Sequence, residues 1–353
     1  MYKYYFILSR LLSINKFSLK SLLNISIVLS VILSSIIVPL TLSISDGFKS
    51  NIINKIIKFD GYARLYNKDL NISEHEYLIG KYDTSIIPFS EKEAIIRVNN
   101  ISEGITYLEL KSINYLNDFI IKSNNKNSGI YIGLQLSENL FPNNNSLDEN
   151  VFIIHGSNEI YKTNIAGIFK TGIPLYDKHM IIELNTSIKH DGFIINKNDY
   201  IDINNDFYIP AHTYKDRYYD FIKWLDSYNL PINLLLFFII VICIVNNSFC
   251  FNIDLINREN DIALINTLGI DKKSIFNILW LKYSILNFIG IFIGSISCFF
   301  LMLVEYNFNL IKLPEDIYFT SNLPISFNII NFLVVPGILL LNIIYKRIRL
   351  KRY

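Results

Sequence analysis

The stretch Ile25-Ser-Ile-Val-Leu-Ser-Val-Ile-Leu-Ser-Ser-Ile-Ile-Val38 decides the fold class, because it lies in an uncharged run that extends from Ser21 to Ser45. A helix rises about 1.5 Å per residue, so about 25 residues cross a bilayer core of about 30 Å. A cleaved signal peptide is the alternative, but its apolar segment is only about 7–15 residues long. No small-x-small cleavage site follows this run. The stretch therefore predicts a membrane-spanning helix.

Three further uncharged runs predict three more spans. They cover residues 227–253, 283–304 and 317–345, and each exceeds the ~10–14 residues of a buried helix in a soluble protein. The predicted fold class is an α-helical membrane protein with four transmembrane helices and a large mixed α/β domain between spans one and two. The four predicted spans are residues 21–45, 230–253, 276–304 and 324–345.

The composition agrees with a membrane chain and excludes several other classes. Of 353 residues, 51% are hydrophobic and 18% are charged, whereas about a quarter of the residues of soluble domains are charged. The formal net charge of +2 is too small to indicate a nucleic-acid binder. The three cysteines exclude a disulfide-rich scaffold.

Lysine and arginine in the short flanking segments predict the orientation of the spans. Basic residues gather in the N-terminal segment 1–20, the loop 254–275 and the tail 346–353, which are therefore predicted to be cytoplasmic. The segment 46–229 and the short loop 305–323 are predicted to lie on the opposite side. The chain is thus expected to be a multi-pass membrane protein with both ends inside.

The segment between the first two spans predicts one folded domain with strands and helices. Short apolar runs alternate with turn clusters, a pattern typical of strands, and acidic residues outnumber basic ones. We expect strands over 62–66, 94–98, 105–110, 151–154, 164–169 and 180–184. We expect helices over 46–59, which continues span one outward, and over 114–122, 134–140 and 214–228.

No catalytic, cofactor or metal site is predicted in the chain. Gly167 and Gly172 have the glycine spacing of a P-loop. However, Ile173 and Pro174 follow in place of the lysine and hydroxyl residue that hold phosphates. The five histidines are scattered through the outer segment without the spacing of a metal-binding motif, so a metal site built from histidines distant in sequence stays open as an alternative. The sequence therefore predicts a chain that is not an enzyme.

Small and polar residues inside the spans predict where helices approach one another. A GxxxG pair in span three lets two backbones come close, and adjacent asparagines in span two are costly in lipid unless they are hydrogen-bonded. Serines four apart place small polar groups on one face of span one. These residues are Gly290, Gly294, Asn246, Asn247, Ser26, Ser30 and Ser34. Packing within the chain, a partner protomer and a substrate groove all remain open as explanations for them.

The cytoplasmic loop Asn257-Arg-Glu-Asn-Asp-Ile-Ala-Leu-Ile-Asn-Thr-Leu-Gly-Ile-Asp-Lys-Lys-Ser274 predicts a short helix. Two helical turns are expected over 261–268. They end at Gly269, which is typical of a left-handed cap at the end of a helix.

This short helix is predicted to be amphipathic. Leu264, Ile265 and Leu268 share an arc of about 100° on its surface, and Arg258 and Asp261 are expected to make polar contacts at its edge. Such a helix either lies on the membrane or docks into a groove of a cytoplasmic partner.

The loop resembles the signature R-x-x-E-I-[AG]-[IL]-L-[KR]-[AT]-L-G-A of MacB/FtsX-type ABC transporter permeases. The order and spacing of further segments extend this resemblance over nearly the whole chain and agree best with the lipoprotein-releasing branch, the LolC/LolE-like permeases. Those segments are 45–48, 58–61, 130–137, 164–172 with 176–177, 221–225, 313–318 and 323–324.

The resemblance implies a permease subunit of the bacterial inner membrane. Such permeases pair with a second permease protomer, identical or paralogous, and with two copies of a P-loop ATPase that binds ATP and Mg. The pair takes lipoproteins from the inner membrane and passes them to a periplasmic chaperone. The segment 46–229 would then be a periplasmic, MacB-like core domain, and no cofactor is expected in this chain.

The resemblance also assigns roles to residues. The helix that couples the permease to the ATPase would comprise Arg258, Asp261, Ala263, Leu264, Ile265, Leu268 and Gly269. Residues flanking the lipid cavity would be Ser30, Ser34, Asp46, Gly47 and Phe48.

The chain departs from the family signature at two positions of the loop. Asn266 stands where the family usually has Lys or Arg, and Ile270 replaces the final Ala, so the docking is expected to be less electrostatic. Two other functions remain as alternatives: an FtsX-like non-transporting regulator of a cell-wall hydrolase, and an efflux permease with a separate ATPase.

Overall fold

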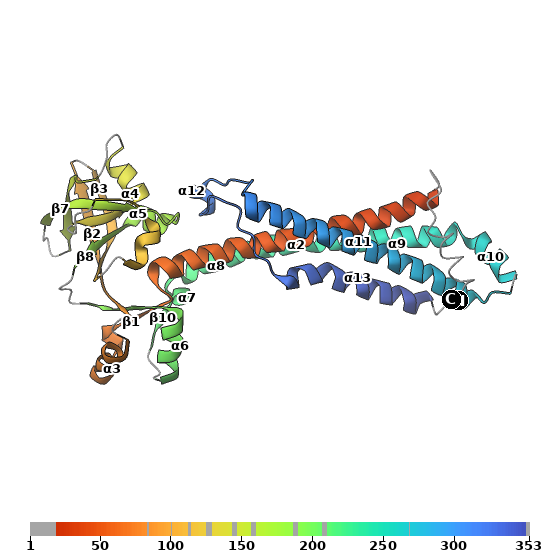
Figure 1. Ribbon diagram of the computed structural model, residues 1–353, viewed down its shortest axis with the longest axis horizontal. Coiled ribbons are helices and arrows are strands. Elements are labelled where there is room, and N and C mark those ends of the chain that lie inside the picture. The colour runs from red at the N-terminus through yellow and green to blue at the C-terminus, as the bar shows by residue number, and fades with distance from the viewer. Residues whose placement is uncertain are drawn as a thin grey trace. The chain divides into compact units, whose positions relative to one another are not determined.

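The structure is a computed structural model that describes residues 19–82, 85–99, 101–111, 114–124, 129–142, 147–156, 160–185, 190–206, 210–267 and 269–350. The chain divides into two compact units, whose elements are drawn in Figure 1. The helix unit comprises Met1–Lys49, Leu225–Lys312 and Asn322–Tyr353. The sheet unit comprises Ser50–Trp224 and Leu313–Ser321. Most of the predicted N-terminal segment 1–20 lies outside the described residues.

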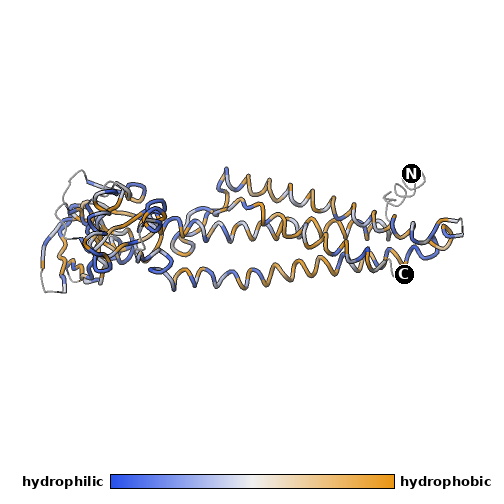
Figure 2. Tube along the Cα trace, turned by 90° about the horizontal axis from the view of Figure 1, so that it is seen from below, coloured by the Kyte–Doolittle hydropathy of each residue, from blue (hydrophilic) through white to orange (hydrophobic). Residues whose placement is uncertain are grey.

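Four long helices carry the apolar runs. They are α2 (Leu19–Asp60), α9 (Asn229–Ile256), α11 (Lys272–Phe308) and α13 (Ile329–Leu350). Within the described part of the chain, these are the four helices long and apolar enough to cross a membrane, as the sequence predicts. Hydrophobic residues dominate along them in Figure 2. Pro39 lies inside α2 without ending it, and the helix continues to Asp60, which confirms the helix predicted over 46–59.

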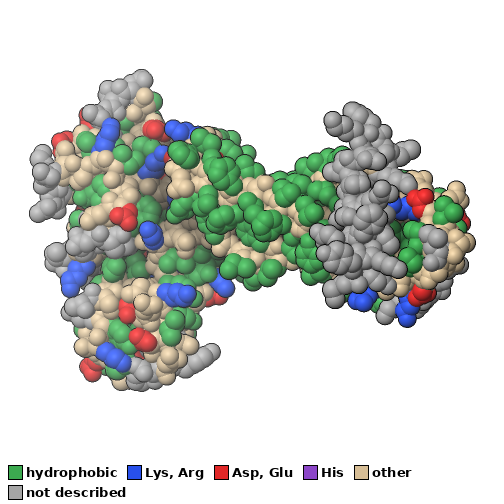
Figure 3. Space-filling model, turned by 45° about the vertical axis from the view of Figure 1, so that its right-hand side comes forward, with side chains coloured by type: hydrophobic (Ala, Val, Ile, Leu, Met, Phe, Trp, Pro, Cys, Tyr) green, Lys and Arg blue, Asp and Glu red, His purple; other side chains and the backbone are tan. Residues whose placement is uncertain are grey.

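The surface of the helix unit is apolar. On α9, Leu230, Phe237 and Ile242 are 71%, 61% and 66% exposed, and hydrophobic side chains cover the visible face of the long helices in Figure 3. Monomeric soluble proteins rarely expose continuous apolar surfaces of this kind, so these side chains suit a lipid environment or a partner protein.

The described strands form one mixed sheet of ten strands. Six of the strands close into a ring, a seventh pairs with one strand of that ring, and the other three continue the sheet from the ring. The strands are β1 (Ala63–Tyr66), β2 (Ile87–Val98), β3 (Ile101–Leu110), β4 (Ile120–Ser123), β5 (Ile130–Gly133), β6 (Asn150–His155), β7 (Ile160–Phe169), β8 (Met180–Leu184), β9 (Gly192–Ile195) and β10 (His212–Thr213).

Six strands close into a ring in the order β2–β3–β8–β5–β7–β6 and back to β2. Successive residues of a strand point to opposite faces, and on β2 the inward residues are Ala94, Ile96 and Val98, all of which are buried. Their partners across the ring include Ile153 of β6 and Ile181 of β8. The ring therefore encloses one hydrophobic core of the sheet unit.

A second core lies beside β9, β1 and β10, which continue the sheet from β2. Helix α3 (Ile72–Tyr82) contributes Leu78, and helix α6 (Lys197–Asp206) contributes Ile203. Both side chains pack with Phe193 of β9. The sheet unit thus has two cores.

Short elements complete the chain. The helix predicted over 134–140 is confirmed as α4, whereas the helix predicted over 214–228 is interrupted at Tyr218 and forms α7 and α8. These elements are η1 (Asn67–Asp69), η2 (Asn114–Phe119), α4 (Leu134–Leu140), α5 (Pro174–His179), α7 (Tyr214–Arg217), α8 (Tyr219–Ser227), α10 (Glu259–Thr267) and α12 (Glu315–Tyr318).

The helix predicted over 114–122 is wrong. The segment begins with the 3-10 turns of η2 and ends as β4, which pairs antiparallel with β7. The N–H of Lys170 also donates to the carbonyl of Phe119 at 2.8 Å. Pairing with β7 satisfies these backbone groups, and β-branched residues such as Ile120 and Ile121 suit a strand.

Candidate functional site

Helix α10 connects α9 to α11 at the position where the sequence predicts the coupling helix. At its end, the N–H of Gly269 donates to the carbonyl of Asn266 at 3.0 Å, and the N–H of Ile270 donates to the carbonyl of Ile265 at 3.4 Å. Gly269 has a φ of +83°. These features together form a Schellman cap, so Gly269 has the left-handed conformation that the sequence predicts.

The outer surface of α10 offers an apolar contact. Leu264 is 65% exposed, and Asp261 and Ala263 are also exposed, whereas Ile265 is half-buried. The predicted arc therefore turns partly inward at Ile265. Leu268 lies outside the described residues.

A buried ion cluster supports the start of α10. Arg258 Nε donates to Asp254 Oδ1 at 2.8 Å, and Lys282 Nζ donates to Asp254 Oδ2 at 2.7 Å. The side chains of Arg258, Asp254 and Lys282 are only 8%, 10% and 3% exposed. The cluster ties the residue before α10 to α9 and α11.

Arg258 is expected from the sequence to make polar contacts at the edge of the coupling helix, and in the structure its polar contact is with a residue of the same chain. It precedes α10, and its guanidinium group is buried against Asp254. Arg258 therefore holds the helix in position, and the exposed residues of α10 are the ones that offer contacts to a partner.

A second polar cluster joins α13 to α9 and α11 near the same end of the helices. Lys346 Nζ donates to the carbonyl of Asn247 at 3.2 Å and to Tyr283 Oη at 3.1 Å. It also lies 4.2 Å from the ring centre of Tyr283 and 4.7 Å from that of Phe251, which are cation–π contacts. Lys346 is only 7% exposed.

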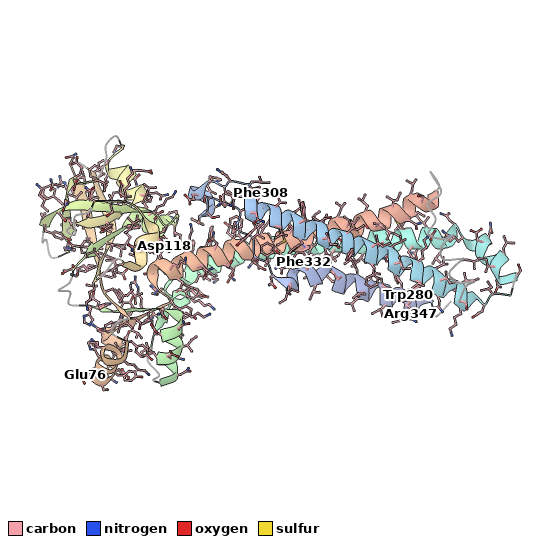
Figure 4. The ribbon with its side chains drawn as sticks, in the orientation of Figure 1. Glu76, Asp118, Trp280, Phe308, Phe332 and Arg347 are labelled. Carbon is pink, nitrogen blue, oxygen red and sulfur yellow. The ribbon has the colours of Figure 1, made fainter. Side chains whose placement is uncertain are left out.

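Trp280 and Arg347 add a further link between α11 and α13. Trp280 Nε1 donates to the carbonyl of Ile343 at 3.0 Å, and the guanidinium of Arg347 lies 4.7 Å from the centre of the indole ring. Figure 4 shows the two labelled side chains close together. The helix ends around α10 are therefore held by several independent contacts.

The predicted helix-packing glycines lie against α2. A Cβ atom at Gly290 would come within 2.8 Å of Val31 Cβ, and one at Gly294 within 2.7 Å of Ser35 Cβ. The sequence left open whether these glycines contact the same chain, a partner protomer or a substrate. In the structure they pack against a helix of the same chain.

The two asparagines of α9 face different helices. Asn246 Nδ2 lies 3.4 Å from the Ser26 carbonyl of α2, whereas Asn247 Nδ2 donates to Asn287 Oδ1 of α11 at 2.8 Å. Asn247 and Asn287 are fully buried. Through their Nδ2 atoms, both asparagines thus contact a neighbouring helix, as polar groups in an apolar helix require, whereas Asn247 Oδ1 is buried and has no hydrogen-bond partner among the described residues.

The serines predicted to flank a cavity lie against α9. Ser34 is 2% exposed, donates to the carbonyl of Val31 at 3.1 Å and lies 3.4 Å from Cys243 Sγ. Cys243 in turn lies 3.6 Å from the carbonyl of Ser30. Small residues at this contact let α2 and α9 approach closely.

Asp46 and Gly47 hold the segment that leads into α13. Asn331 Nδ2 donates to Asp46 Oδ2 at 2.9 Å, and a Cβ atom at Gly47 would come within 2.2 Å of the carbonyl oxygen of Pro324. Only glycine fits at such a distance. Phe48, the third residue predicted here, is half-buried.

In the sheet unit, the last residue of α2 is the centre of a buried polar network. The carboxylate of Asp60 accepts hydrogen bonds from Arg64, Arg217 and Tyr218, and Arg64 also pairs with Glu91. Asp60 and Arg64 are 1% and 2% exposed. The network fixes the end of α2 to β1, β2 and α7, which gives a structural role to the family-like segment 58–61.

A second buried carboxylate shapes the turn before α5. Asp177 accepts hydrogen bonds from the N–H and hydroxyl of Thr171 and from the N–H of Gly172, each at 2.8 Å. Burial raises the pKa of the Asp177 carboxyl above its usual value, although these hydrogen bonds act in the opposite direction. Gly172 has a φ of +75°, so the turn needs glycine there.

The segment Leu313–Ser321, which connects α11 to α13 along the chain, belongs to the sheet unit. Lys55 Nζ donates to the carbonyl of Phe319 at 2.7 Å, and Lys170 forms an ion pair with Glu315. The ring of Phe319 meets that of Phe221 edge to face, with centroids 6.0 Å apart. These contacts fasten the segment to the rest of the sheet unit.

Residues 233–350 match the family model described as FtsX-like permease C-terminal. The chain carries an FtsX-like permease domain. All residues of the α10 site lie in this FtsX-like domain, including Asp254, Arg258 and Leu264. The family resemblance in the sequence is thereby confirmed.

A curated protein similar to this chain is the lipoprotein-releasing system transmembrane protein LolC of Buchnera aphidicola subsp. Schizaphis graminum (strain Sg). The two are 25% identical over 338 residues, which cover 84% of this chain and 82% of the relative.

Two solved structures are also similar to part of this chain. One is the extracellular domain of the noncanonical ABC-type transporter YknZ from Gram-positive bacteria, with 13% identity and a TM-score of 0.29, covering 43% of this chain and 98% of that one. The other is the periplasmic region of MacB from Actinobacillus actinomycetemcomitans, with 14% identity and a TM-score of 0.29, covering 40% and 73% of the two chains.

Sequence reasoning on the FtsX-like domain missed the residues that support α10. Asp254 and Lys282 lie just outside the apolar runs, and neither of them is predicted from the sequence to have a role in the site. The one local signal is the i, i+4 spacing of Asp254 and Arg258, which pairs opposite charges on a helix. Lys282 is 28 residues from Asp254, so its part in the cluster needs the tertiary fold.

Proposed function

We propose that the chain is the permease subunit of an ABC transporter that releases lipoproteins from the bacterial inner membrane to a periplasmic chaperone. The FtsX-like domain and the similarity to LolC over 84% of the chain support this proposal. ATP and Mg would be bound by a separate P-loop ATPase, present in two copies, and a second permease protomer, identical or paralogous, would complete the complex.

The observation that carries the proposal is the construction of α10. A short capped helix presents Ala263 and the apolar side chain of Leu264 outward, while Arg258 is held by a buried ion cluster at its start. An apolar side chain on a firmly held helix suits docking into a groove of a partner protein. Because α10 is firmly held, motion of the ATPase would be passed on to α9 and α11. A flexible loop in its place would absorb that motion.

The charges near α10 support its placement in the cytoplasm. Arg258, Lys273, Lys346 and Arg347 all lie close to the helix ends next to this loop, and basic residues favour the cytoplasmic side of a membrane. The segment 46–229 would then lie in the periplasm, where the lipoprotein is handed to the chaperone.

Docking of the ATPase is tested by a pair of substitutions at one position. Leu264→Glu puts a charge into the apolar contact, so we expect the ATPase to be lost when the full-length chain is purified in mild detergent. Leu264→Met keeps an apolar side chain of similar volume and should retain the ATPase. Equal recovery of the ATPase with both variants would contradict docking at α10.

The substrate is tested separately by depletion of the chain. We expect lipoproteins to accumulate in the inner membrane, measured by membrane fractionation. Unchanged sorting of lipoproteins, together with capture of a cell-wall hydrolase by the periplasmic segment, would favour the regulatory alternative. Unchanged sorting with altered sensitivity to toxic compounds would favour an efflux permease.

A further inference from the structure

Two histidines that are far apart in the sequence face each other in the sheet unit. His75 lies on α3, next to Glu76, which Figure 4 labels, and His190 shortly precedes β9. Their Nε2 atoms are 3.2 Å apart, and the two rings are nearly parallel, with an interplanar angle of 14°. Both rings are half-buried, so water and ions reach them.

The framework around the pair holds both rings in place. Each ring lies against buried Phe193, with centroid distances of 5.4 Å for His75 and 4.9 Å for His190. Asn67 Nδ2 donates to the carbonyl of His190 at 2.6 Å. The backbone carrying each imidazole is thus fixed by the second core of the sheet unit.

The spacing of the two nitrogens suits a shared metal ion. Histidine nitrogens bind Zn²⁺ at about 2.0–2.1 Å, so two of them at a tetrahedral angle are about 3.3 Å apart. The observed 3.2 Å is close to this value. The other explanation for the contact is a hydrogen bond between the two rings. A distance of 3.2 Å is at the long end of the ~2.7–3.2 Å range for hydrogen bonds donated by N–H groups.

We propose that His75 and His190 bind a divalent transition-metal ion through their Nε2 atoms, with Zn²⁺ as the occupant. Imidazole suits Zn²⁺, Cu²⁺ and Ni²⁺. No cluster of three potential metal ligands occurs among the described residues, so the two histidines are the protein ligands and water fills the other positions. Bound metal joins α3 to the start of β9 across 115 positions of sequence and stabilises the second core.

Titration of the metal-free, full-length chain in detergent with Zn²⁺ tests this site. We expect calorimetry to show one binding event, which His75→Gln and His190→Gln each weaken by at least about tenfold. The control is His179→Gln, at an exposed position on α5, which should bind as the wild type does. Absence of binding, or equal affinity in the His75→Gln and control proteins, overturns the proposal.

A spectroscopic measurement on the unmodified chain avoids any dependence on the folding of the variants. With Cu²⁺ as the probe, we expect an electron paramagnetic resonance spectrum with superhyperfine splitting from two nitrogens. Splitting from one nitrogen, or from none, overturns the site. Neither experiment uses transport or an ATPase, so the outcome is independent of the proposed transporter function.

Discussion

Asp254 is the residue on which the support of α10 most depends. It is the one carboxylate in hydrogen bonds with both Arg258 and Lys282 among the contacts of the described residues. Two cations with little contact to water need this partner, because an unpaired buried charge is strongly unfavourable. The position of α10 therefore depends on a charge in α9.

Replacing Asp254 with Asn should destabilise the helix unit. The substitution removes the negative charge that Arg258 and Lys282 share, and breaking a buried ion pair by removing one partner costs about 3–5 kcal/mol in comparable cases. We expect a clearly lower midpoint when the full-length chain is unfolded by heat or denaturant in detergent.

The matched control is the same substitution in an exposed ion pair. Asp226 pairs with Lys49, and their side chains are 47% and 40% exposed, so Asp226→Asn should cost no more than about 1 kcal/mol. Similar shifts of the unfolding midpoint for the two variants would show that the buried cluster stabilises the protein no more than an exposed ion pair does.

Two glycines of α11 let this helix pack closely against α2. Gly290 and Gly294 leave space for Val31 and Ser35 of α2. The helices of a membrane protein gain little from hydrophobicity against one another, so such close contacts supply much of the packing energy. These glycines thus determine how α2 and α11 meet.

Two Gly→Ala substitutions separate packing from helix propensity. At Gly290 the new methyl group would lie 2.8 Å from Val31 Cβ, whereas at Gly337 of α13 no atom lies within 4 Å. We expect Gly290→Ala to lower the unfolding temperature and Gly337→Ala to leave it unchanged or raise it slightly, since Ala is the better helix former. A lower unfolding temperature for Gly337→Ala than for Gly290→Ala would contradict the close contact between α2 and α11.

The segment Leu313–Ser321 is a further element whose position rests on a few side chains. Lys55 holds the carbonyl of Phe319, and Phe319 itself has a φ of +59°, a conformation unusual for a residue with a side chain. The hydrogen bond from Lys55 and the packing of the aromatic ring offset that cost.

Lys55→Met should release this segment. The aliphatic part of the side chain remains, but the hydrogen bond to Phe319 is lost, so we expect amide hydrogen exchange to increase at residues 313–321. Lys58→Met, at an exposed position of the same helix, is the control and should leave exchange unchanged. Equal exchange in both variants would mean that Lys55 does not hold the segment.

Features that depend on residues close together in the chain could be predicted from the sequence. Features that depend on contacts between distant residues could not. Long uncharged runs predict spans directly, and Gly269 is recognisable as a cap because the apolar pattern stops beside it. The strand ring was not predictable, since it pairs Ile95 with Ile154 and Thr106 with Met180. The segment 114–122 was misassigned because its apolar spacing suits a helix until pairing with β7 is known.

The candidate site shows the same division between local and tertiary information. The exposed Leu264 and the glycine cap were predicted from the loop alone, whereas the buried state of Arg258 was not. The small residues Gly290, Gly294 and Ser34 were identified as contact positions, but their partners on other helices depend on tertiary packing. The sequence left a site built from distant histidines open but did not single out His75 and His190, because a pair 115 positions apart forms no motif.

For the whole molecule, these features agree with the proposed mechanical coupling. The FtsX-like domain spans residues 233–350, and α2 is one helix of 42 residues that supplies residues to both compact units. Within the helix unit, the cluster at Asp254 holds the end of α9, and within the sheet unit, the cluster at Asp60 holds the end of α2. This construction suits a permease that passes on motion generated by a separate ATPase.

The most direct test of the central proposal is ATP-dependent release of a lipoprotein from proteoliposomes. The vesicles would contain the full-length chain with its partner permease and ATPase, and purified chaperone would be added outside. We predict transfer of the lipoprotein to the chaperone with the wild-type chain and little transfer with Leu264→Glu. Equal transfer with both chains, or transfer in vesicles lacking this chain, would contradict the proposal.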